Sequence, residues 1–194
     1  MGVLVTGGAG YIGSHMVLSL LEAGEEVVVL DNLSTGFRWA VPDQVKIVVG
    51  DVGDAEVVCS LLKRHAIDAI MHFAGSVVVP DSVKHPLAYY LNNTCNSRSL
   101  IQCAVKEGVR HFIFSSTAAV YGVPPAIPVS EDAPLKPISP YGSSKLMTEM
   151  ILRDVALAHG LNYAALRYFN VAGADPRRRS GQSTPRATRR EFGP

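Results

Sequence analysis

Short runs rich in apolar residues recur along the first 170 residues of the chain. Runs of this kind, apolar on both faces, are typical of strands buried in a parallel sheet. They cover residues 3–5, 27–30, 45–49, 69–73, 111–115 and 161–169. Stretches with helical spacing lie between them, at residues 12–23, 54–65, 87–107 and 141–159. This alternation predicts an α/β fold, a Rossmann-like doubly wound parallel sheet with flanking helices.

Residues that start or stop helices support these boundaries. Gly24, Gly108 and Gly160 lie where three helices should end, and Asp54 is placed to cap the start of another. Residues 122–140 contain six prolines, which excludes a helix or a central strand there. A loop of this length in a compact domain is often functional, so we interpret it as a candidate lid or substrate wall.

The composition narrows the class of protein. Hydrophobic residues make up 47% of the 194 residues and charged residues 18%, which favours a well-buried globular chain. The net charge of +1 gives no indication of nucleic-acid binding, and no apolar run is long enough for a membrane helix. The three cysteines lie in apolar segments and are interpreted as reduced thiols, neither a disulfide frame nor a metal site. We therefore expect a cytoplasmic protein without a signal peptide.

A glycine cluster follows the first apolar run directly. Gly8, Gly10 and Gly13 match G-x-G-x-x-G, and Gly7, Gly10 and Gly13 match G-x-x-G-x-x-G. Such glycines permit a tight turn, the close approach of a pyrophosphate and close packing of helix on strand. The helix that begins near Tyr11 offers free N–H groups to phosphates. The alternative is a glycine-rich turn without a ligand, but the strand before it and the helix after it favour dinucleotide binding.

An acidic residue ends the second run. Asp31 lies 18 residues after Gly13, near the separation expected for the carboxylate that binds the adenosine ribose. Its charge would repel a 2′-phosphate, so the sequence favours NAD over NADP. A role for Asp31 as a turn or helix cap stays open, and Arg38 could in principle serve a 2′-phosphate.

Two polar groups are candidates for catalysis. Ser115, Ser116 and Thr117 follow the fifth run, at the sheet edge where ligands bind in open α/β sheets. Tyr141 and Lys145 are four residues apart and share one helix face. A phenol with an ordinary pKa of about 10 is a poor base at neutral pH, but a nearby ammonium lowers that pKa. Tyr141 is therefore predicted to be a general base toward a sugar hydroxyl, which Thr117 could hold.

At this point the chain resembles the extended short-chain dehydrogenase/reductase family, and within it the UDP-glucose 4-epimerases. The resemblance spans residues 1–174. The matching stretches, in order, are TGGAGYIGSH, DNLSTG, GDV, HFAG, YYLNN, FSSTAAVYG, SPYGSSK and LRYFNVAGA. It implies tightly held NAD, a UDP-sugar substrate and a homodimer in full-length relatives. It also implies a smaller carboxyl-terminal substrate domain, which would be largely missing here.

The resemblance further implies the residues that line the cofactor and substrate. Around the pyrophosphate these are Gly7, Gly10, Tyr11, Ile12 and Gly13, and around the adenosine ribose Asp31, Asn32, Leu33, Ser34, Thr35 and Gly36. Along the rest of the cofactor they are Asp51, Val52, Phe73, Ala74, Gly75, Ser76, Val77, Asn92, Thr117, Tyr141, Lys145 and Phe169. The sugar nucleotide would contact Thr117, Tyr141 and Asn170. Some relatives carry a lysine where this chain has Val77, so that pyrophosphate contact is absent or replaced.

The implied reaction is epimerisation at C4′ of UDP-glucose and UDP-galactose through transient oxidation to a 4-ketose. Nucleotide-sugar 4,6-dehydratases are the closest alternative, but they place an Asp-Glu pair after the threonine. Ala118 and Ala119 follow Thr117 here, which leaves elimination without its proton donor. The choice between hexose and N-acetylhexosamine, and between galactose use and polysaccharide supply, stays open.

The last twenty residues differ from the rest, with six arginines and no apolar periodicity. We expect residues 1–174 to form an NAD-binding domain and residues 175–194 an irregular basic tail. A basic tail that binds an acidic partner or nucleic acid is one alternative. We favour a truncated or frame-shifted start of the substrate domain, in which case the chain would be an NAD-binding fragment with little activity of its own.

Overall fold

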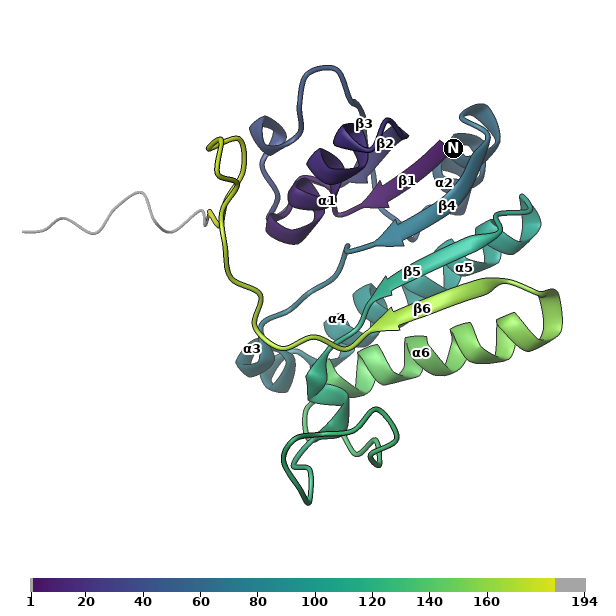
Figure 1. Cartoon of the computed structure of the whole chain (residues 1–194). Coiled ribbons are helices and arrows are strands. Elements are labelled where there is room, and N and C mark those ends of the chain that lie inside the picture. The colour runs from purple at the N-terminus through teal and green to yellow at the C-terminus, as the bar shows by residue number, and fades with distance from the viewer. Residues whose placement is uncertain (1, 184–194) are drawn as a thin grey trace, which may run out of the picture.

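The structure is a computed structural model that describes residues 2–183. Within these residues, parallel strands form a six-stranded sheet in the order β3-β2-β1-β4-β5-β6 (Figure 1). The strands are β1 (Gly2–Thr6), β2 (Glu26–Asp31), β3 (Lys46–Val49), β4 (Ile67–His72), β5 (His111–Ser115) and β6 (Asn162–Leu166). The chain moves from β1 to one edge and then to the other, which confirms the doubly wound parallel fold.

Helices cover both faces of the sheet (Figure 1). They are α1 (Tyr11–Glu22), α2 (Ala55–Arg64), α3 (Val79–Lys84), α4 (Pro86–Tyr89), α5 (Asn96–Lys106) and α6 (Pro140–His159). Shorter turns of helix are the π-helical Tyr90–Cys95 and the 3₁₀ segments Arg38–Ala40 and Ala118–Tyr121. The loop between Ala118–Tyr121 and α6 holds no helix or strand, as its prolines predict.

The core lies in two layers because successive strand residues point to opposite faces. Val3 and Val5 of β1 join a cluster with Val17 of α1 on one face of the sheet. Leu4, between them, joins the larger cluster on the other face, where Leu152 of α6 is also fully buried. The apolar residues of β1 are therefore buried on both faces of the sheet.

The predicted helix boundaries have identifiable caps. The Asp54 carboxylate accepts hydrogen bonds from the backbone N–H groups of Glu56 and Val57 at the start of α2, as predicted. Ser139 caps α6 in the same way through the Gly142 N–H, a cap that the sequence analysis missed. Gly160 ends α6 with φ of +71°.

The helical region predicted at residues 87–107 is confirmed in extent, but the structure divides it into three parts. The short helix α3 precedes it, α4 begins at Pro86, and Tyr90–Cys95 widens into a π-helix before α5. This widened turn carries Asn93, which is buried and bonded to Ser76 and Ser144. Periodicity along the sequence cannot reveal such a turn, because contacts with distant segments determine it.

The sixth strand is shorter than predicted. The ladder with β5 ends at the pair Ser115 and Leu166, because the chain after Ser115 turns away into the 3₁₀ segment. Residues 167–170 therefore lie beyond the sheet, and Phe169 is 75% exposed. Apolar character alone could not place the end of this strand, because β6 lies at the sheet edge and is itself largely exposed.

Among the described helices, none has both the length and the apolar composition needed to cross a bilayer. The described residues also contain no group of three or more metal-ligating side chains, and Cys59, Cys95 and Cys103 are free thiols. Of the predicted tail, residues 184–194 lie outside the described part of the chain. Before them, Ala174 and Gly181 form an antiparallel bridge.

Candidate cofactor-binding and active site

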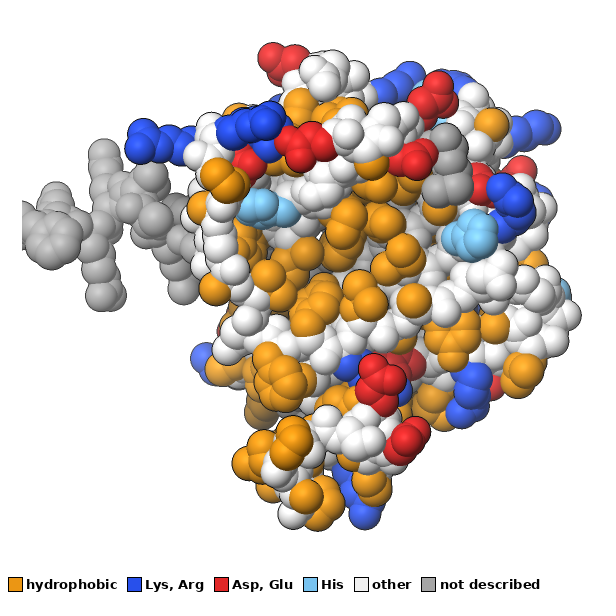
Figure 2. Space-filling view, in the orientation of Figure 1, with side chains coloured by type: hydrophobic (Ala, Val, Ile, Leu, Met, Phe, Trp, Pro, Cys, Tyr) orange, Lys and Arg blue, Asp and Glu red, His pale blue; other side chains and the backbone are white. Residues whose placement is uncertain are grey.

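A groove of about 580 Å³ runs along the carboxyl ends of the strands. The face of the molecule drawn in Figure 2 has a hollow near its centre, and hydrophobic side chains gather there. Most of the predicted cofactor residues line the groove: Gly7, Gly10, Tyr11, Ile12, Gly13, Asp31, Asn32, Ser34, Thr35, Gly36, Asp51, Val52, Phe73, Ala74, Gly75, Ser76, Val77 and Asn92. The structure thus brings residues from four separate loops together, although their contacts with a ligand stay predictions.

The glycine loop at the centre of the groove has no room for side chains. A Cβ on Gly7, whose φ is +70°, would lie 2.5 Å from the backbone N of Ala74. A Cβ on Gly13 would lie 2.1 Å from the Gly7 carbonyl oxygen. The start of α1 at Gly10 has no side-chain cap and no acidic residue in its first turn. Its free N–H groups and dipole thus suit a bound pyrophosphate.

The Asp31 carboxylate has a structural role in addition to the predicted binding of the adenosine ribose. One carboxylate oxygen accepts the Ala9 N–H at 2.9 Å, and the other accepts the Leu33 N–H at 2.8 Å. The side chain therefore holds the glycine loop and the loop after β2 together, which is the capping role left open above. Each oxygen keeps a further lone pair, so the carboxylate can also accept ribose hydroxyls at the groove. Arg38 is engaged elsewhere, because it donates to the Val41 carbonyl.

The next loop along the groove is held by Asp51. Its carboxylate accepts hydrogen bonds from the Gly53 N–H at 2.8 Å and from the Asn96 amide at 3.0 Å. Asn32 donates to its other oxygen at 3.3 Å. These bonds fix Asp51 and the buried Val52 at the adenine end of the predicted cofactor path.

The loop after β4 depends on a residue that the sequence analysis did not select. The Asn93 amide accepts the Ser76 N–H at 2.8 Å and donates to the Ser76 carbonyl at 2.9 Å. The predicted residue, Asn92, lines the groove and donates to the Ser76 hydroxyl. The sequence signal was the polar pair Asn92-Asn93 in a helical stretch. The structure separates their roles, because Asn93 is buried and Asn92 lines the groove.

The proposed catalytic residues lie beside the groove and are not among its lining residues. Lys145 is 2% exposed, and its Nζ donates to the Ser115 carbonyl at 3.1 Å. A Cβ on Gly75 would lie 3.2 Å from this Nζ, so the ammonium lies directly beneath the groove wall. The Thr117 hydroxyl contacts Tyr141.

The acid–base tuning differs from the prediction. Burial raises the pKa of Tyr141, and the hydrogen bond with Thr117 opposes that rise. The expected lowering of this pKa by Lys145 is therefore wrong for the chain without a ligand. The reason is that burial of the phenol disfavours its charged form, and Lys145 is not among the groups that shift its pKa. Burial also lowers the pKa of Lys145, to about 8.

Three predicted residues lie away from this groove. Leu33 packs against the cluster under α1. Phe169 and Asn170 are both exposed, because β6 ends before them. Groove residues that the sequence analysis missed are Leu30, Gly50, Val78, Asp81, Tyr89, Gln182 and Ser183, and Ser115, which it placed at the ligand-binding edge, also lines the groove.

A buried polar network, also missed, supports the catalytic helix. Glu149 of α6 accepts a hydrogen bond from the Ser116 hydroxyl, next to Thr117. Its carboxylate is paired with Arg167, with 2.7 Å between Arg167 Nη2 and Glu149 Oε2. Arg167 also donates to the Tyr121 hydroxyl at 3.1 Å. The network thereby joins the ends of β5 and β6 to α6, the helix that carries Tyr141 and Lys145.

The buried ammonium predicts a dependence of stability on pH. Between pH 8 and about 10.5 the unfolded chain keeps the Lys145 proton and the folded chain without NAD releases it. The free energy of unfolding should therefore rise with pH over this window, by about 3 kcal/mol in total. Urea denaturation from pH 7.5 to 10.5, compared with Lys145→Met, measures the difference. Parallel curves for the two proteins would contradict it.

Comparison with known proteins gives consistent matches. The sequence profile of the NAD dependent epimerase/dehydratase family matches residues 3–190. The chain is 58% identical over 186 residues to a UDP-glucose 4-epimerase of Azospirillum brasilense, covering 96% of this chain and 53% of that protein. The chain thus spans about half the length of the curated relatives it matches.

Solved structures match over the same extent. The UDP-glucose 4-epimerase of Brucella ovis, crystallised in complex with NAD, has a TM-score of 0.92 and 43% identity, covering 94% of this chain and 56% of that one. The UDP-Glc/GlcNAc 4-epimerase of Campylobacter jejuni has a TM-score of 0.86 and 47% identity, covering 96% and 58%. These matches confirm the resemblance that the motifs indicated.

Proposed function

Because the chain belongs to the NAD dependent epimerase/dehydratase family, we propose that it binds NAD in this groove and interconverts UDP-glucose and UDP-galactose at C4′ of the sugar. One observation carries the proposal. The glycine cradle and Asp31 line the same groove whose wall at Gly75 covers the Lys145 ammonium. Residues 1–174 would form the cofactor-binding domain.

The chain offers a complete set of contacts for NAD. The free N–H groups at the start of α1 would hold the pyrophosphate, and Asp31 the adenosine ribose. Asp51 and Val52 would border the adenine, and Lys145, beneath Gly75, would donate to the nicotinamide ribose. When bound, NAD supplies a reversible hydride acceptor for C4′ of the sugar.

The protein's own part in the reaction is proton transfer and positioning. Tyr141 Oη would take the proton of the 4′-hydroxyl and later return one to the epimeric hydroxyl. Thr117, which contacts Tyr141, would orient that hydroxyl. Burial raises the pKa of Tyr141, so the phenol is protonated at neutral pH in the chain alone. The positive charges of Lys145 and a bound nicotinamide would favour the phenolate once the site is filled.

The dehydratase alternative is not favoured. Thr117 caps the 3₁₀ segment Ala118–Tyr121, which begins with two alanines in place of an acidic pair. Elimination of water would therefore lack its proton donor beside the base. We also propose a homodimer, which the resemblance supports, and a cytoplasmic location, which the three free thiols support.

Calorimetry with NAD and NADP tests the cofactor side of the proposal. We expect NAD to bind more tightly, because the Asp31 carboxylate repels a 2′-phosphate. Asp31→Asn should weaken NAD binding by about 10–100-fold, which is the range for hydrogen bonds to a charged group. It should also reduce the preference for NAD over NADP. Asp43→Asn, an exposed acid outside the groove, is the matched control. Tighter NADP binding by the unaltered chain would contradict the assignment.

The catalytic side is tested by following UDP-galactose conversion. Since relatives are about twice as long, the assay uses the chain and also a chimera that joins it to the remaining half of the Azospirillum brasilense relative. A chimera that binds NAD and converts no UDP-sugar would overturn the proposed reaction while leaving the cofactor assignment standing.

A further inference from the structure

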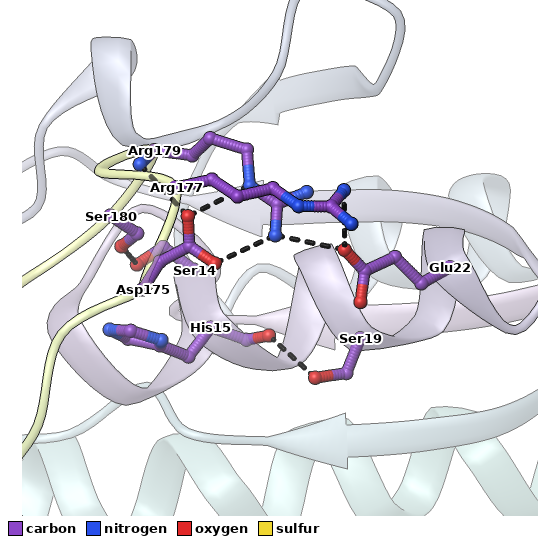
Figure 3. Close-up of polar contacts among 8 residues, drawn as sticks. All are labelled: Ser14, His15, Ser19, Glu22, Asp175, Arg177, Arg179 and Ser180. Carbon is purple, nitrogen blue, oxygen red and sulfur yellow. Dashed lines mark hydrogen bonds and ion pairs between the residues drawn. The ribbon is translucent and has the colours of Figure 1, made fainter.

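The chain after β6 crosses in front of the strand ends and reaches α1 on the far side of the groove (Figure 1). Residues 173–183 of this segment, which we call the strap, fold into a tight turn against α1 (Figure 3). The Ala174–Gly181 bridge closes the turn, and the Asp175 N–H donates to the Ser180 carbonyl at 3.0 Å. The strap is therefore an ordered turn and not an extended connection.

Inside the turn, Asp175 and Arg179 form an ion pair with hydrogen bonds. The Asp175 carboxylate accepts hydrogen bonds from the Arg179 backbone N–H at 3.0 Å and from its Nε and Nη2 at 2.9 and 2.7 Å. This guanidinium holds the pKa of Asp175 well below its usual range. Arg179 Nη2 also lies 2.8 Å from a carboxylate oxygen of Glu22, at the end of α1. Arg179 thus joins the turn to the helix.

The strap is also attached near the start of α1. The Tyr11 hydroxyl donates to the Gly173 carbonyl at 2.6 Å. The hydroxyls of Ser14 and Ser180 lie 2.5 Å apart and both residues are buried. Tyr11, Ser14 and Glu22 lie on one face of α1, so the strap contacts that face, with its turn at the start of the helix and its arginine side chains reaching Glu22 at the end (Figure 3).

The end of the strap lies in the groove. Gln182 and Ser183 line it together with Tyr11 and Gly13, at the proposed pyrophosphate site. We propose that the strap retains the bound cofactor: Arg179, through Asp175 and Glu22, positions Gln182 and Ser183 over the cofactor at the start of α1. This inference rests on the proposed binding of NAD in the groove.

The strength of the attachments indicates how the strap works. The side chains of Glu22 and Arg179 are 54% and 35% exposed, and solvent screens such ion pairs, so each contributes little to stability. The strap can therefore open without unfolding the sheet, and a bound cofactor would stabilise the closed position. Its role is then to lengthen the residence time of NAD, and Arg179 is a positioning residue for the cofactor.

The test compares the rate of NAD release from the whole chain and two variants. Arg179→Gln removes the shorter of two ion pairs with Glu22 and leaves the 3.7 Å pair of Arg177 in place. Arg178→Gln removes an equal charge from a strap residue with no ion pair among the described residues. We expect Arg179→Gln to release NAD about threefold to tenfold faster, and Arg178→Gln to stay within about twofold of the unaltered chain. Raising the salt concentration should speed release from the unaltered chain but not from Arg179→Gln.

Trypsin gives a second readout that does not depend on release rates, because the strap contains three arginines in succession. Saturating NAD should slow cleavage at residues 177–179 in the unaltered chain, with mass spectrometry identifying the sites. The protection should be weaker in Arg179→Gln at the two remaining arginines, and circular dichroism should show the same fold for all three proteins.

The outcomes of these experiments distinguish a failure of the strap's proposed role from a failure of the proposed function. Equal release rates in the two variants, or cleavage that NAD does not slow, would overturn the strap's role in a chain that does bind NAD. A chain that binds no NAD by calorimetry would overturn the proposed function and the strap's role together.

Discussion

Phenylalanine in place of Tyr141 is expected to leave NAD binding unchanged and to lower kcat by about 10²–10⁴-fold, the usual contribution of a general base. The substitution removes only the hydroxyl oxygen that contacts Thr117. The ring stays in its half-buried position at the start of α6, next to Lys145 on the same face. The proposed cofactor contacts of the glycine loop, Asp31 and Lys145 are untouched, so the loss should appear in kcat while the Kd for NAD is kept.

The measurement uses the chimera described above, with calorimetry for NAD and a coupled assay for UDP-galactose. Tyr163→Phe is the matched control, since Tyr163 lies on β6 with 38% of its surface exposed. It should retain full turnover. A Tyr141→Phe enzyme with unchanged kcat would remove Tyr141 from the role of base and leave the groove without one.

Much of this fold could be predicted because its determinants are local. Strands β1 and β2 have both faces buried, so a run such as residues 27–30 of β2 is recognisable from apolar character alone. The glycine loop is equally local, because Gly7 and Gly13 lie where backbone from neighbouring segments leaves no space for a Cβ. Where local signals and tertiary packing agree, as at Asp54 and α2, the boundary was predicted within a residue or two.

The failures share a physical cause, which is contact between residues far apart in sequence. The end of β6 depends on where its neighbour β5 stops, and the widened turn at Tyr90–Cys95 carries Asn93, which bonds to residues 17 and 51 positions away. The pKa of Lys145 depends on complete burial by the surrounding elements. None of these effects leaves a periodic pattern in the sequence.

The residues of the candidate site were likewise predicted where local signals determine them and missed where contacts between distant segments do. Motif spacing predicted the glycine loop and Asp31, and the family resemblance implied the other groove residues up to Asn92, which meet because the carboxyl ends of neighbouring strands lie at one edge. It could not predict Gln182 and Ser183, which reach the groove only because the strap is attached to α1. It also could not predict Glu149 as the partner of Arg167, since the two are 18 residues apart on different elements.

That pair carries the second large effect that we expect. Glu149→Ala should lower the free energy of unfolding by about 3 kcal/mol, because removing one partner of a buried ion pair leaves the other charge uncompensated. The Glu149 side chain is only 7% exposed and that of Arg167 23%. The change would also leave the buried Ser116 hydroxyl without its acceptor. Arg167→Met should have a comparable effect, since it leaves a buried carboxylate.

A double-mutant cycle identifies the interaction itself. We expect the double variant Glu149→Ala/Arg167→Met to be less destabilised than the sum of the two single variants, with a coupling energy of about 1–3 kcal/mol. Arg153 and Asp154 form an exposed pair on the same helix, with side chains 58% and 65% exposed, and their cycle should give a coupling near zero. Urea denaturation of the six variants measures both cycles. Additive effects at Glu149 and Arg167 would show that the network fills space beside the catalytic helix without holding it, and α6 would then owe its position to its apolar contacts, such as those of Leu152.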